Sequence, residues 1–333
     1  MSFLIYLDQN SLSDLRQRRI EDSKDEHFRL LKHALKSEQV TVVYSHVTLD
    51  EISQISKIEY QQEHIDTLTE LNAKYIEPLP RTLSHLAPEN IWRAHIENKQ
   101  SNIDLGITSL IEASQLSVRK ISGLKIEESF SEINTKLKES LNELISSCES
   151  QLASIDADKL SEAEKEFFLN IQRQMDETRA KIPSLQAPEI DTGKPLGPQP
   201  FREISEIKSL EIQSMDANHV VRAIESTFNL ENSNFKLSDY FEGTPQTDVA
   251  RAYSLMNWAG YYADDFTKAK KGKDRFNASN NDMQHAVAAC GVNFLISNDI
   301  KFCKKATACF AYINSSTIVC SPKEFIESHC KFV

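Results

Sequence analysis

The sequence lacks the signatures of several protein classes. Its longest nearly apolar stretch, Ala286 to Ile296, is far shorter than the roughly 18 residues of a membrane span. None of the 6 cysteines forms a C-x-x-C pair, although five lie between Cys290 and Cys330, so the spacing of a zinc site is missing. There is also no P-loop, no G-x-G-x-x-G, no H-E-x-x-H and no Ser-His-Asp set at a supporting spacing. Membrane proteins, zinc modules and the common nucleotide-binding and hydrolase classes are therefore disfavoured.

The start of the chain carries no basic segment and reaches an acid at Asp8, so we expect no secretory signal peptide. Cysteines without a pairing pattern are typical of free thiols in a reducing compartment. We therefore expect a cytoplasmic protein with no membrane partner.

The net charge of the chain is negative, but positive charge is concentrated in one segment. The 333 residues predict about two domains, and 40% hydrophobic with 26% charged residues is ordinary globular usage. A net charge of −11 makes the chain a poor general binder of nucleic acid. Between Phe266 and Lys305, however, eight Lys/Arg and three Asp give +5. We expect any site for a polyanion near that stretch.

Short apolar runs at both ends of the chain predict an α/β fold. Phe3–Leu7 and Val40–Tyr44 are typical of buried strands, and each precedes a helical pattern that extends to about residues 35 and 73, respectively. Near the other end, Val292–Ile296 is a third strand, and Phe310–Ile313 and Ser316–Cys320 are further strand candidates. Strands that alternate with helices predict a parallel sheet.

The middle of the chain is predicted to be helical. Apolar residues recur every three or four positions from Ile126 to Ile155, and a second helix is predicted from Ser161 to Lys181, so the two form a helical hairpin. Residues 183–200 hold five of the ten prolines and are predicted to be a loop. We therefore expect a discontinuous α/β domain (1–80 and 270–333) with an all-helical insertion (85–265), whose hairpin is a candidate for self-association or for binding a regulatory protein.

Four carboxylates stand where predicted strands lead into helices: Asp8, Glu51, Asp282 and Asp299. In parallel sheets, sites form at the carboxyl ends of the strands. Four acids in one cleft cannot all stay ionised without cations, and hard oxygen ligands suit Mg²⁺ or Mn²⁺. Two such ions about 3.5–4 Å apart would clamp a phosphodiester and activate a water.

Each acid also has a purely structural interpretation. Asp8 and Asp299 are suited to N-capping the helices that follow them. Thr48 with Glu51 fits the S/T-x-x-E capping box, and Ser279 with Asp282 has a similar layout. Capping is a sufficient explanation for each acid taken alone. Four acids at one edge of one sheet, however, favour a functional site over four unrelated caps.

The segments around these acids resemble the motifs of the PIN-domain nucleases. Residues 3–10 (FLIYLDQN) resemble the family's opening strand and Asp-x-Asn, and residues 45–51 (SHVTLDE) resemble its Ser-x-x-Thr-x-x-Glu helix start. Residues 281–289 (NDMQHAVAA) are similar to the Asp-bearing helix, and residues 294–302 (FLISNDIKF) to the Ser-x-Asp motif after the next strand. Residues 320–325 (CSPKEF) resemble the family's Pro-x-x-Phe ending.

The resemblance covers about residues 1–80 and 275–333 and implies a PIN-like fold and site. It implies that the four acids are metal ligands, directly or through water. Ser297 would hold a water or a carboxylate nearby. Asn10 would fix the loop after Asp8 by a hydrogen bond, or else touch the substrate. His285, three residues after Asp282 on the same helix face, would pack or support a ligand, or else bind the metal. Asp50 would replace Glu51 as ligand if the helix register differed by one residue.

The basic residues near the acids are candidate phosphate contacts, with a solvated loop as the alternative: Lys268, Lys270, Lys271, Lys273, Arg275, Lys301, Lys304 and Lys305. Arg16, Arg18 and Arg19 are weaker candidates. The aromatic residues Trp258, Tyr261, Tyr262 and Phe276 suit base stacking or, at helical spacing, core packing.

The resemblance implies a metal-dependent nuclease that hydrolyses RNA by a two-metal-ion mechanism and leaves a 5′-phosphate. Bacterial members of the family often serve as toxins or in antiphage defence, which implies control by a partner. A DNA substrate shares the same chemistry, because contacts with a 2′-hydroxyl cannot be read from sequence. The long insertion and the acidic charge favour a second hypothesis, a catalytically silent PIN-like scaffold that acts by binding a partner.

Overall fold

The computed structural model describes residues 2–22, 26–78, 80–156, 159–187, 195–227, 243–264 and 275–330. The chain forms two compact units, Met1–His95 with Pro198–Val333, and Ile96–Gly197. Helices α10 to α13, which lie in the range expected as an insertion, belong to the first unit. None of the described helices is both long and apolar enough to cross a membrane.

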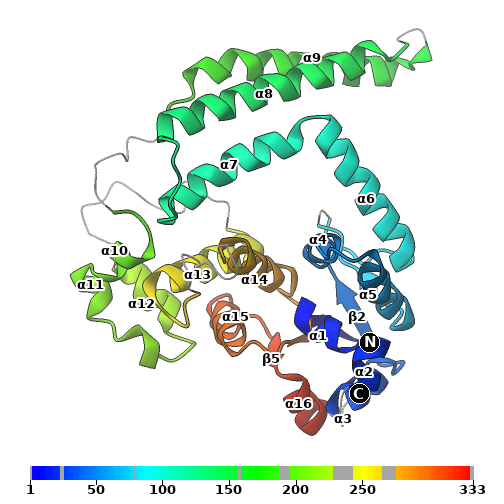
Figure 1. Cartoon of the computed structure of the whole chain (residues 1–333), viewed down its shortest axis with the longest axis vertical. Coiled ribbons are helices and arrows are strands. Elements are labelled where there is room, and N and C mark those ends of the chain that lie inside the picture. The colour runs from blue at the N-terminus through cyan, green and yellow to red at the C-terminus, as the bar shows by residue number, and fades with distance from the viewer. Residues whose placement is uncertain are drawn as a thin grey trace. The chain divides into compact units, whose positions relative to one another are not determined.

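The first unit is built on a five-stranded sheet in which all neighbouring strands are parallel, which confirms the predicted α/β class (Figure 1). The strands are β1 (Phe3–Leu7), β2 (Val40–Tyr44), β3 (Lys74–Tyr75), β4 (Phe294–Ile296) and β5 (Ile318–Cys320). Their order is β3-β2-β1-β4-β5, so the chain fills one side of β1 first and returns to fill the other side. The order reverses between β1 and β4, and the crevice outside the carboxyl ends of two such strands is where ligands bind in open parallel sheets.

Helices cover both faces of this sheet, which explains why its strands are continuous apolar runs. On one face Tyr6, Val43 and Leu295 pack in a core with residues of α13 (Pro245–Ala259), α14 (Phe276–Ala288) and α15 (Ile300–Tyr312). On the other face, Ile5 and Val42 pack in a core with residues of α1 (Gln9–Asp14), α3 (Glu26–Leu35) and α5 (Ile58–Glu70). Side chains of successive residues point to opposite faces, so Ile5 and Tyr6 belong to different cores.

The remaining elements of this unit are shorter helices. They are α2 (Gln17–Asp22), α4 (His46–Ser53), α10 (Pro198–Arg202), α11 (Ser205–Lys208), α12 (Val220–Ser226) and α16 (Pro322–Glu324), with a 3-10 turn at Ile212–Ser214 and a π-helical turn at Phe325–His329. Helix α6 (Pro88–Asp104) contains the boundary between the two units.

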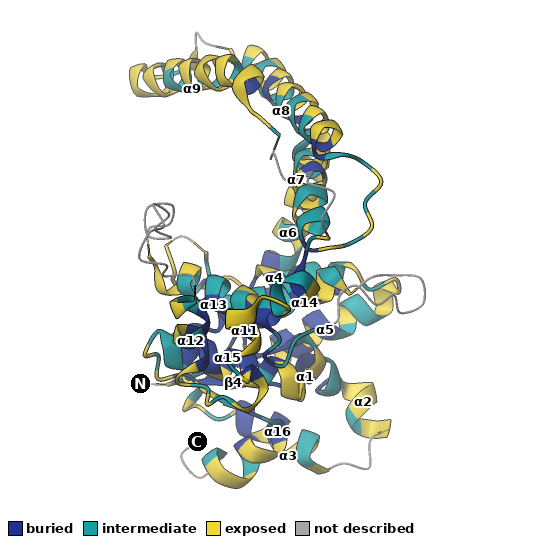
Figure 2. Ribbon diagram, turned by 90° about the vertical axis from the view of Figure 1, so that its left-hand side faces the viewer, coloured by how far each residue is buried: buried dark blue, intermediate teal, exposed yellow. Residues whose placement is uncertain are grey.

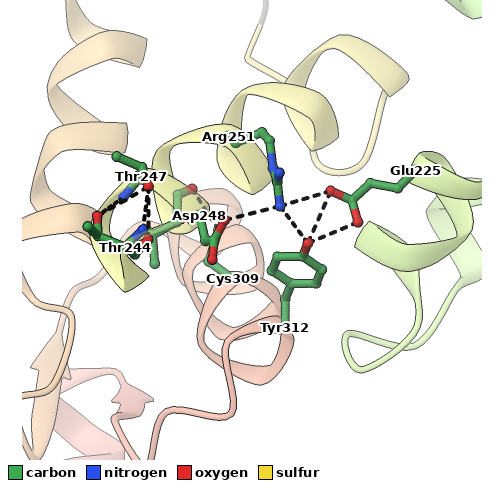
Figure 3. A network of polar contacts seen from close by, with 8 residues as sticks. Glu225, Thr244, Thr247, Asp248, Arg251, Cys309 and Tyr312 are labelled. Carbon is green, nitrogen blue, oxygen red and sulfur yellow. Dashed lines mark hydrogen bonds and ion pairs between the residues drawn. The ribbon is translucent and has the colours of Figure 1, made fainter. Parts of the chain in front are cut away.

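One arginine connects three helices on the first face (Figure 3). Arg251 of α13 donates to the hydroxyl of Tyr312 on α15 at 2.6 Å and lies 3.2 Å from a carboxylate oxygen of Glu225 on α12. It also pairs with Asp248 one turn earlier, at 3.1 Å, while the Tyr312 hydroxyl donates to Glu225 at 2.9 Å. This network fixes α12 and α15 against α13, the helix that leads to Asp264.

The second unit consists of long helices with little buried surface: α7 (Ile107–Ile121), α8 (Phe130–Ala153) and α9 (Glu162–Lys181), followed by a 3-10 turn at Ile182–Ser184. Figure 2 shows these helices as mostly exposed or half-buried, in contrast to the sheet. Capping boxes begin α8 at Ser129 and α9 at Ser161, and Arg179 of α9 makes two bonds of 2.7 and 2.8 Å to Glu149 of α8. The predicted helical hairpin is therefore present.

Two glycines allow the chain to close on itself at the base of this unit. Gly123 and Gly197 both have positive φ, +81° and +104°. A Cβ on Gly123 would lie 2.6 Å from the carbonyl oxygen of Leu196, and one on Gly197 would lie 2.7 Å from that of Ser122. Only glycine fits both the backbone conformation and the close approach.

Several local predictions were wrong for identifiable reasons. Phe310–Ile313 is not a strand, because Phe302, Ala306 and Cys309 continue one apolar helix face and α15 extends to Tyr312. The helix predicted from residue 45 to 73 is two helices, α4 and α5, and the one predicted up to residue 35 is three. The two-residue strand β3 was missed because it has no periodicity to detect.

Candidate active site

Asp8 and Asp299 lie at the carboxyl ends of the neighbouring strands β1 and β4, and one serine connects them. The hydroxyl of Ser297 donates to Asp8 Oδ2 at 2.6 Å and accepts the Asp299 amide at 3.0 Å. Both acids are also N-caps: Asp8 accepts the Ser11 amide at 2.7 Å, and Asp299 accepts the Phe302 amide at 3.0 Å. The capping interpretation of these two acids is thus right, and the caps hold their carboxylates at the edge of the β1–β4 crevice.

Asp8 is almost fully buried, and burial raises the pKa of its carboxyl group. Hydrogen bonds from Ser297 and Ser11 favour the charged form and oppose this effect. Asn10, expected to fix the loop after Asp8, is instead an exposed residue in the first turn of α1. The local bond at this turn is the one from the Ser11 amide to Asp8.

Glu51 projects from α4 toward α14, where two side chains bind its two oxygens. Asn281 Nδ2 donates to Oε1 at 2.9 Å, and His285 Nε2 lies 2.8 Å from Oε2. Burial disfavours the charged form of Glu51, but the hydrogen bonds from His285 and Asn281 outweigh it and lower the pKa of the carboxyl group. Glu51 is therefore held as an oriented carboxylate.

His285 links Glu51 to the buried sheet. A carboxylate only accepts, so Nε2 carries the hydrogen of the Glu51 bond, and in the neutral ring Nδ1 accepts the hydroxyl of Tyr6 at 2.7 Å. The Tyr6 oxygen also lies 2.8 Å from the hydroxyl of Ser45, the N-cap of α4. This row of side-chain contacts, from Ser45 through Tyr6 and His285 to Glu51, connects α4, β1 and α14.

The capping-box interpretation of Glu51 and Asp282 is wrong. Helix α4 begins after Ser45, so Thr48 and Glu51 lie within it, and α14 begins at Phe276, so Asp282 lies in its body. Asp50, the alternative to Glu51, is 47% exposed and lies 3.5 Å from His95 Nε2. It is Glu51 that faces α14.

Asp282 is the most electrostatically perturbed acid of the site. Burial is the largest cause that raises the pKa of its carboxyl group, to about 8, and the charges of Asp264, Asp299 and Glu51 raise it further. Lys305 acts in the opposite direction. The carboxylates of Asp282 on α14, Glu51 on α4, Asp264 after α13 and Asp299 at the start of α15 thus act on one another. A carboxyl group whose pKa is raised this far is typical of a functional site.

Asp264 and the burial of Lys305 were not foreseen from the sequence. The Lys305 side chain is fully buried; its ammonium donates to Asp264 Oδ2 and lies 4.5 Å from the centre of the Tyr253 ring. Ser279 also donates to Asp264 Oδ2, at 2.9 Å. Nothing local marks Asp264, because its side-chain partners are 15 and 41 residues away.

The structure describes only some of the other predicted nucleic-acid contacts. Lys268, Lys270, Lys271 and Lys273 lie outside the described residues, and Arg275 is the N-cap of α14. Lys301 and Lys304 are exposed on α15, and the Lys301 ammonium donates to the Ala263 carbonyl at 2.9 Å.

The aromatic cluster is largely structural. Tyr261 is buried and makes an edge contact with Tyr262 at 4.8 Å, and Trp258 makes one with Phe201 at 5.9 Å. Core packing is therefore the interpretation that these contacts favour.

The chemistry of the donor set suits a hard divalent cation. Its oxygens are carboxylates supported by Ser297 and Asn281, the ligand type of Mg²⁺ and Mn²⁺. Within the residues that the structure describes, no three His, Cys, Asp or Glu side chains are grouped closely enough to form a metal site by themselves.

Comparison of the chain with protein-family profiles, curated proteins and solved structures returned no match. The function proposed below therefore rests on the residues of the site and on the motifs that resemble the PIN family.

Proposed function

We propose that this protein is a PIN-like, divalent-cation-dependent nuclease that hydrolyses RNA phosphodiester bonds by a two-ion mechanism. The observation that supports it most is the pair of carboxylates Asp8 and Asp299, which Ser297 joins at the β1–β4 crevice. Nearby, burial and the charges of three neighbouring carboxylates raise the pKa of Asp282 to about 8. Such a cluster is costly unless cations neutralise it, and a sheet edge at which strand order reverses is where ligands bind.

The proposed roles follow from the contacts. Asp8, Glu51, Asp282 and Asp299 would hold Mg²⁺ or Mn²⁺, directly or through water. Bound there, the cation would supply an activated water and neutralise charge on the leaving oxygen. Ser297 keeps the Asp8 carboxylate in place, and Asn281 and His285 keep that of Glu51. Such supporting bonds typically change metal affinity or activity 10–100-fold when removed.

Cationic surface on described helices supports a strand-like polyanion as substrate. Lys301 and Lys304 are exposed on α15, the helix that Asp299 caps. After α1, the helix that Asp8 caps, Arg18 lies 5.5 Å from the centre of the Tyr60 ring and Lys57 lies 5.1 Å from it. Cationic side chains beside an aromatic ring are typical of surfaces that bind single-stranded nucleic acid.

One observation favours a second candidate function, a PIN-like scaffold that acts through a bound partner. Within the described residues the carboxylates do not form a group of three at metal-binding distance. The second unit, with its exposed α-helices, would supply surface for that partner. The two candidates differ in whether the acids bind Mn²⁺.

A cleavage assay distinguishes them. Labelled structured RNA, single-stranded RNA and single-stranded DNA are incubated with the full chain in Mn²⁺, in Mg²⁺ or in EDTA. Asp299→Asn is the test variant and Asp50→Asn the matched control, because the Asp50 side chain is 47% exposed and lies against His95. We expect metal-dependent cutting of RNA that is lost in Asp299→Asn and kept in Asp50→Asn. No cutting together with no Mn²⁺ binding would favour the scaffold.

A further inference from the structure

Lys305 is an unusual residue for its position. It is 0% exposed, in an α/β core, with its ammonium against Asp264 and over the Tyr253 ring. Buried ion pairs are weak contributors to stability, since desolvation offsets their attraction, and an apolar residue of the same size often serves equally well. Fold stability alone therefore gives little reason for a lysine here.

The surroundings of Lys305 are strongly negative. Asp264 Oδ2 accepts hydrogen bonds from both Lys305 and Ser279, and Ser279 lies one turn before Asp282 on α14. The charge of Lys305 opposes the burial and the neighbouring carboxylates that raise the pKa of Asp282. Burial raises the pKa of the Tyr253 hydroxyl, whose ring lies beneath the ammonium, and the charges of Asp282, Asp264 and Asp299 raise it further. Three carboxylates therefore act on the place where the lysine charge is held, and among the described residues we find no other buried ammonium in that core.

We propose that Lys305 is a resident cation of the carboxylate cluster: held by Asp264 and Tyr253, it supplies a fixed positive charge beside Asp282 and thereby sets how strongly the cluster binds a divalent cation. This inference rests on the proposed function and assigns Lys305 and Asp264 to the site as positioning residues. It also replaces the predicted role of Lys305 as a phosphate contact, because its ammonium faces Asp264 instead of solvent.

The proposal predicts opposite effects for the two members of the pair. Lys305→Met removes a positive charge, so Mn²⁺ should bind roughly tenfold tighter or more, since a unit charge a few Å away acts strongly in a medium of low dielectric constant. Asp264→Asn leaves the lysine charge uncompensated, so Mn²⁺ should bind about tenfold weaker. The double variant should return close to the wild-type affinity.

Calorimetric titration of the full chain with Mn²⁺ alone measures these affinities. Lys323→Met is the control: the Lys323 side chain on α16 is 65% exposed, so the affinity for Mn²⁺ should change less than about twofold. A merely structural role would weaken Mn²⁺ binding in both single variants. Effects of the same sign, or no change in two folded single variants, would overturn the proposal.

A second measurement does not require metal. Thermal unfolding in EDTA at pH 8.5 compares wild type, Lys305→Met, Asp282→Asn and the double variant. If Lys305 balances the charge of Asp282, Asp282→Asn raises Tm more in the Lys305→Met background than in wild type. Equal shifts in both backgrounds would contradict the inference. If wild type binds no Mn²⁺ while this coupling is present, the charge role of Lys305 stands and the proposed nuclease function fails.

Discussion

His285 Nε2 lies 2.8 Å from Glu51 Oε2, although 234 residues separate them in the chain. The bond brings together α4, near the start of the chain, and α14, which follows the whole helical region. Asn281 of α14 binds the second oxygen of Glu51 at 2.9 Å, so one helix fixes both oxygens. The position of this carboxylate therefore depends on two distant parts of the sequence being folded together.

His285→Ala should impair the proposed site through Glu51. The substitution removes the bond to Glu51 and leaves the Tyr6 hydroxyl without its 2.7 Å partner in the core. We expect Mn²⁺ affinity and RNA cleavage to fall about 10–100-fold and unfolding free energy to fall by about 1–3 kcal/mol. His285→Gln, which retains a donor, should recover part of the loss; identical behaviour of the two variants would contradict the orienting role.

Asp282→Asn should stabilise the metal-free protein in a pH-dependent manner. The folded pKa, about 8, lies above the ordinary value of 3.8, so the folded chain keeps a proton that the unfolded chain releases. Wild-type stability from this group is complete below about pH 3.8 and is lost as pH rises toward 8. Asparagine does not titrate, so its advantage grows over that range and levels off above it.

One pKa unit corresponds to about 1.4 kcal/mol, so we expect a gain of at least about 1.4 kcal/mol at pH 8.5. Urea denaturation in EDTA at several pH values between 5 and 9 measures it. If the unfolding free energies of wild type and Asp282→Asn differ by the same amount at every pH, the pKa of Asp282 is not raised in the folded chain. Asp50→Asn is the control, since its side chain is 47% exposed.

Ser297→Ala should separate the geometry of the site from its charge. The variant loses the 2.6 Å bond to Asp8 and the acceptor for the Asp299 amide, but keeps every carboxylate. Leaving buried polar groups unpaired costs about 1–3 kcal/mol of stability. We expect weaker Mn²⁺ binding with unchanged stoichiometry in calorimetry. Thr at this position keeps the hydroxyl and should restore the affinity.

Arg18→Ala and Lys57→Ala should weaken RNA binding without changing Mn²⁺ affinity. Both cations lie against Tyr60, and Arg18 is 55% exposed. Each lost phosphate contact should reduce the salt dependence of binding by about one unit of slope. Fluorescence anisotropy of labelled single-stranded RNA in EDTA, at several salt concentrations, measures this. Lys323→Ala is the control, because its side chain on α16 is 65% exposed, and an equal effect there would exclude a specific surface around Tyr60.

The sequence was most informative where one local signal determined the structure. Phe3–Leu7 and Val40–Tyr44 were predicted to the residue, because a buried parallel strand is a short apolar run whatever its neighbours are. The N-caps at Asp8 and Asp299 were also recognisable, because a cap depends on bonds to residues three positions later.

Local sequence patterns gave the wrong role for residues whose side-chain partners are distant in the sequence. Thr48 and Glu51 match a capping box, yet α4 begins at His46 and Glu51 is bound by α14. Lys305 resembled an exposed cation because its partner Asp264 is 41 residues away. Asn281 opens the segment that resembles the Asp-bearing helix, but only the packing of α14 against α4 shows that it binds Glu51. These contacts arise from tertiary structure, which neither periodicity nor spacing encodes.

The strand order also determines when the site can exist during synthesis. β1 lies between β2 and β4, so its second edge stays unpaired until β4 has been made. Glu51 and Asp282 are 231 residues apart, which at ribosomal speed corresponds to roughly 10–50 s. A nascent chain therefore carries Asp8 and Glu51 for most of its elongation without their partners. If the proposed activity is correct, the translating ribosome and its message are protected from the enzyme while it is being made.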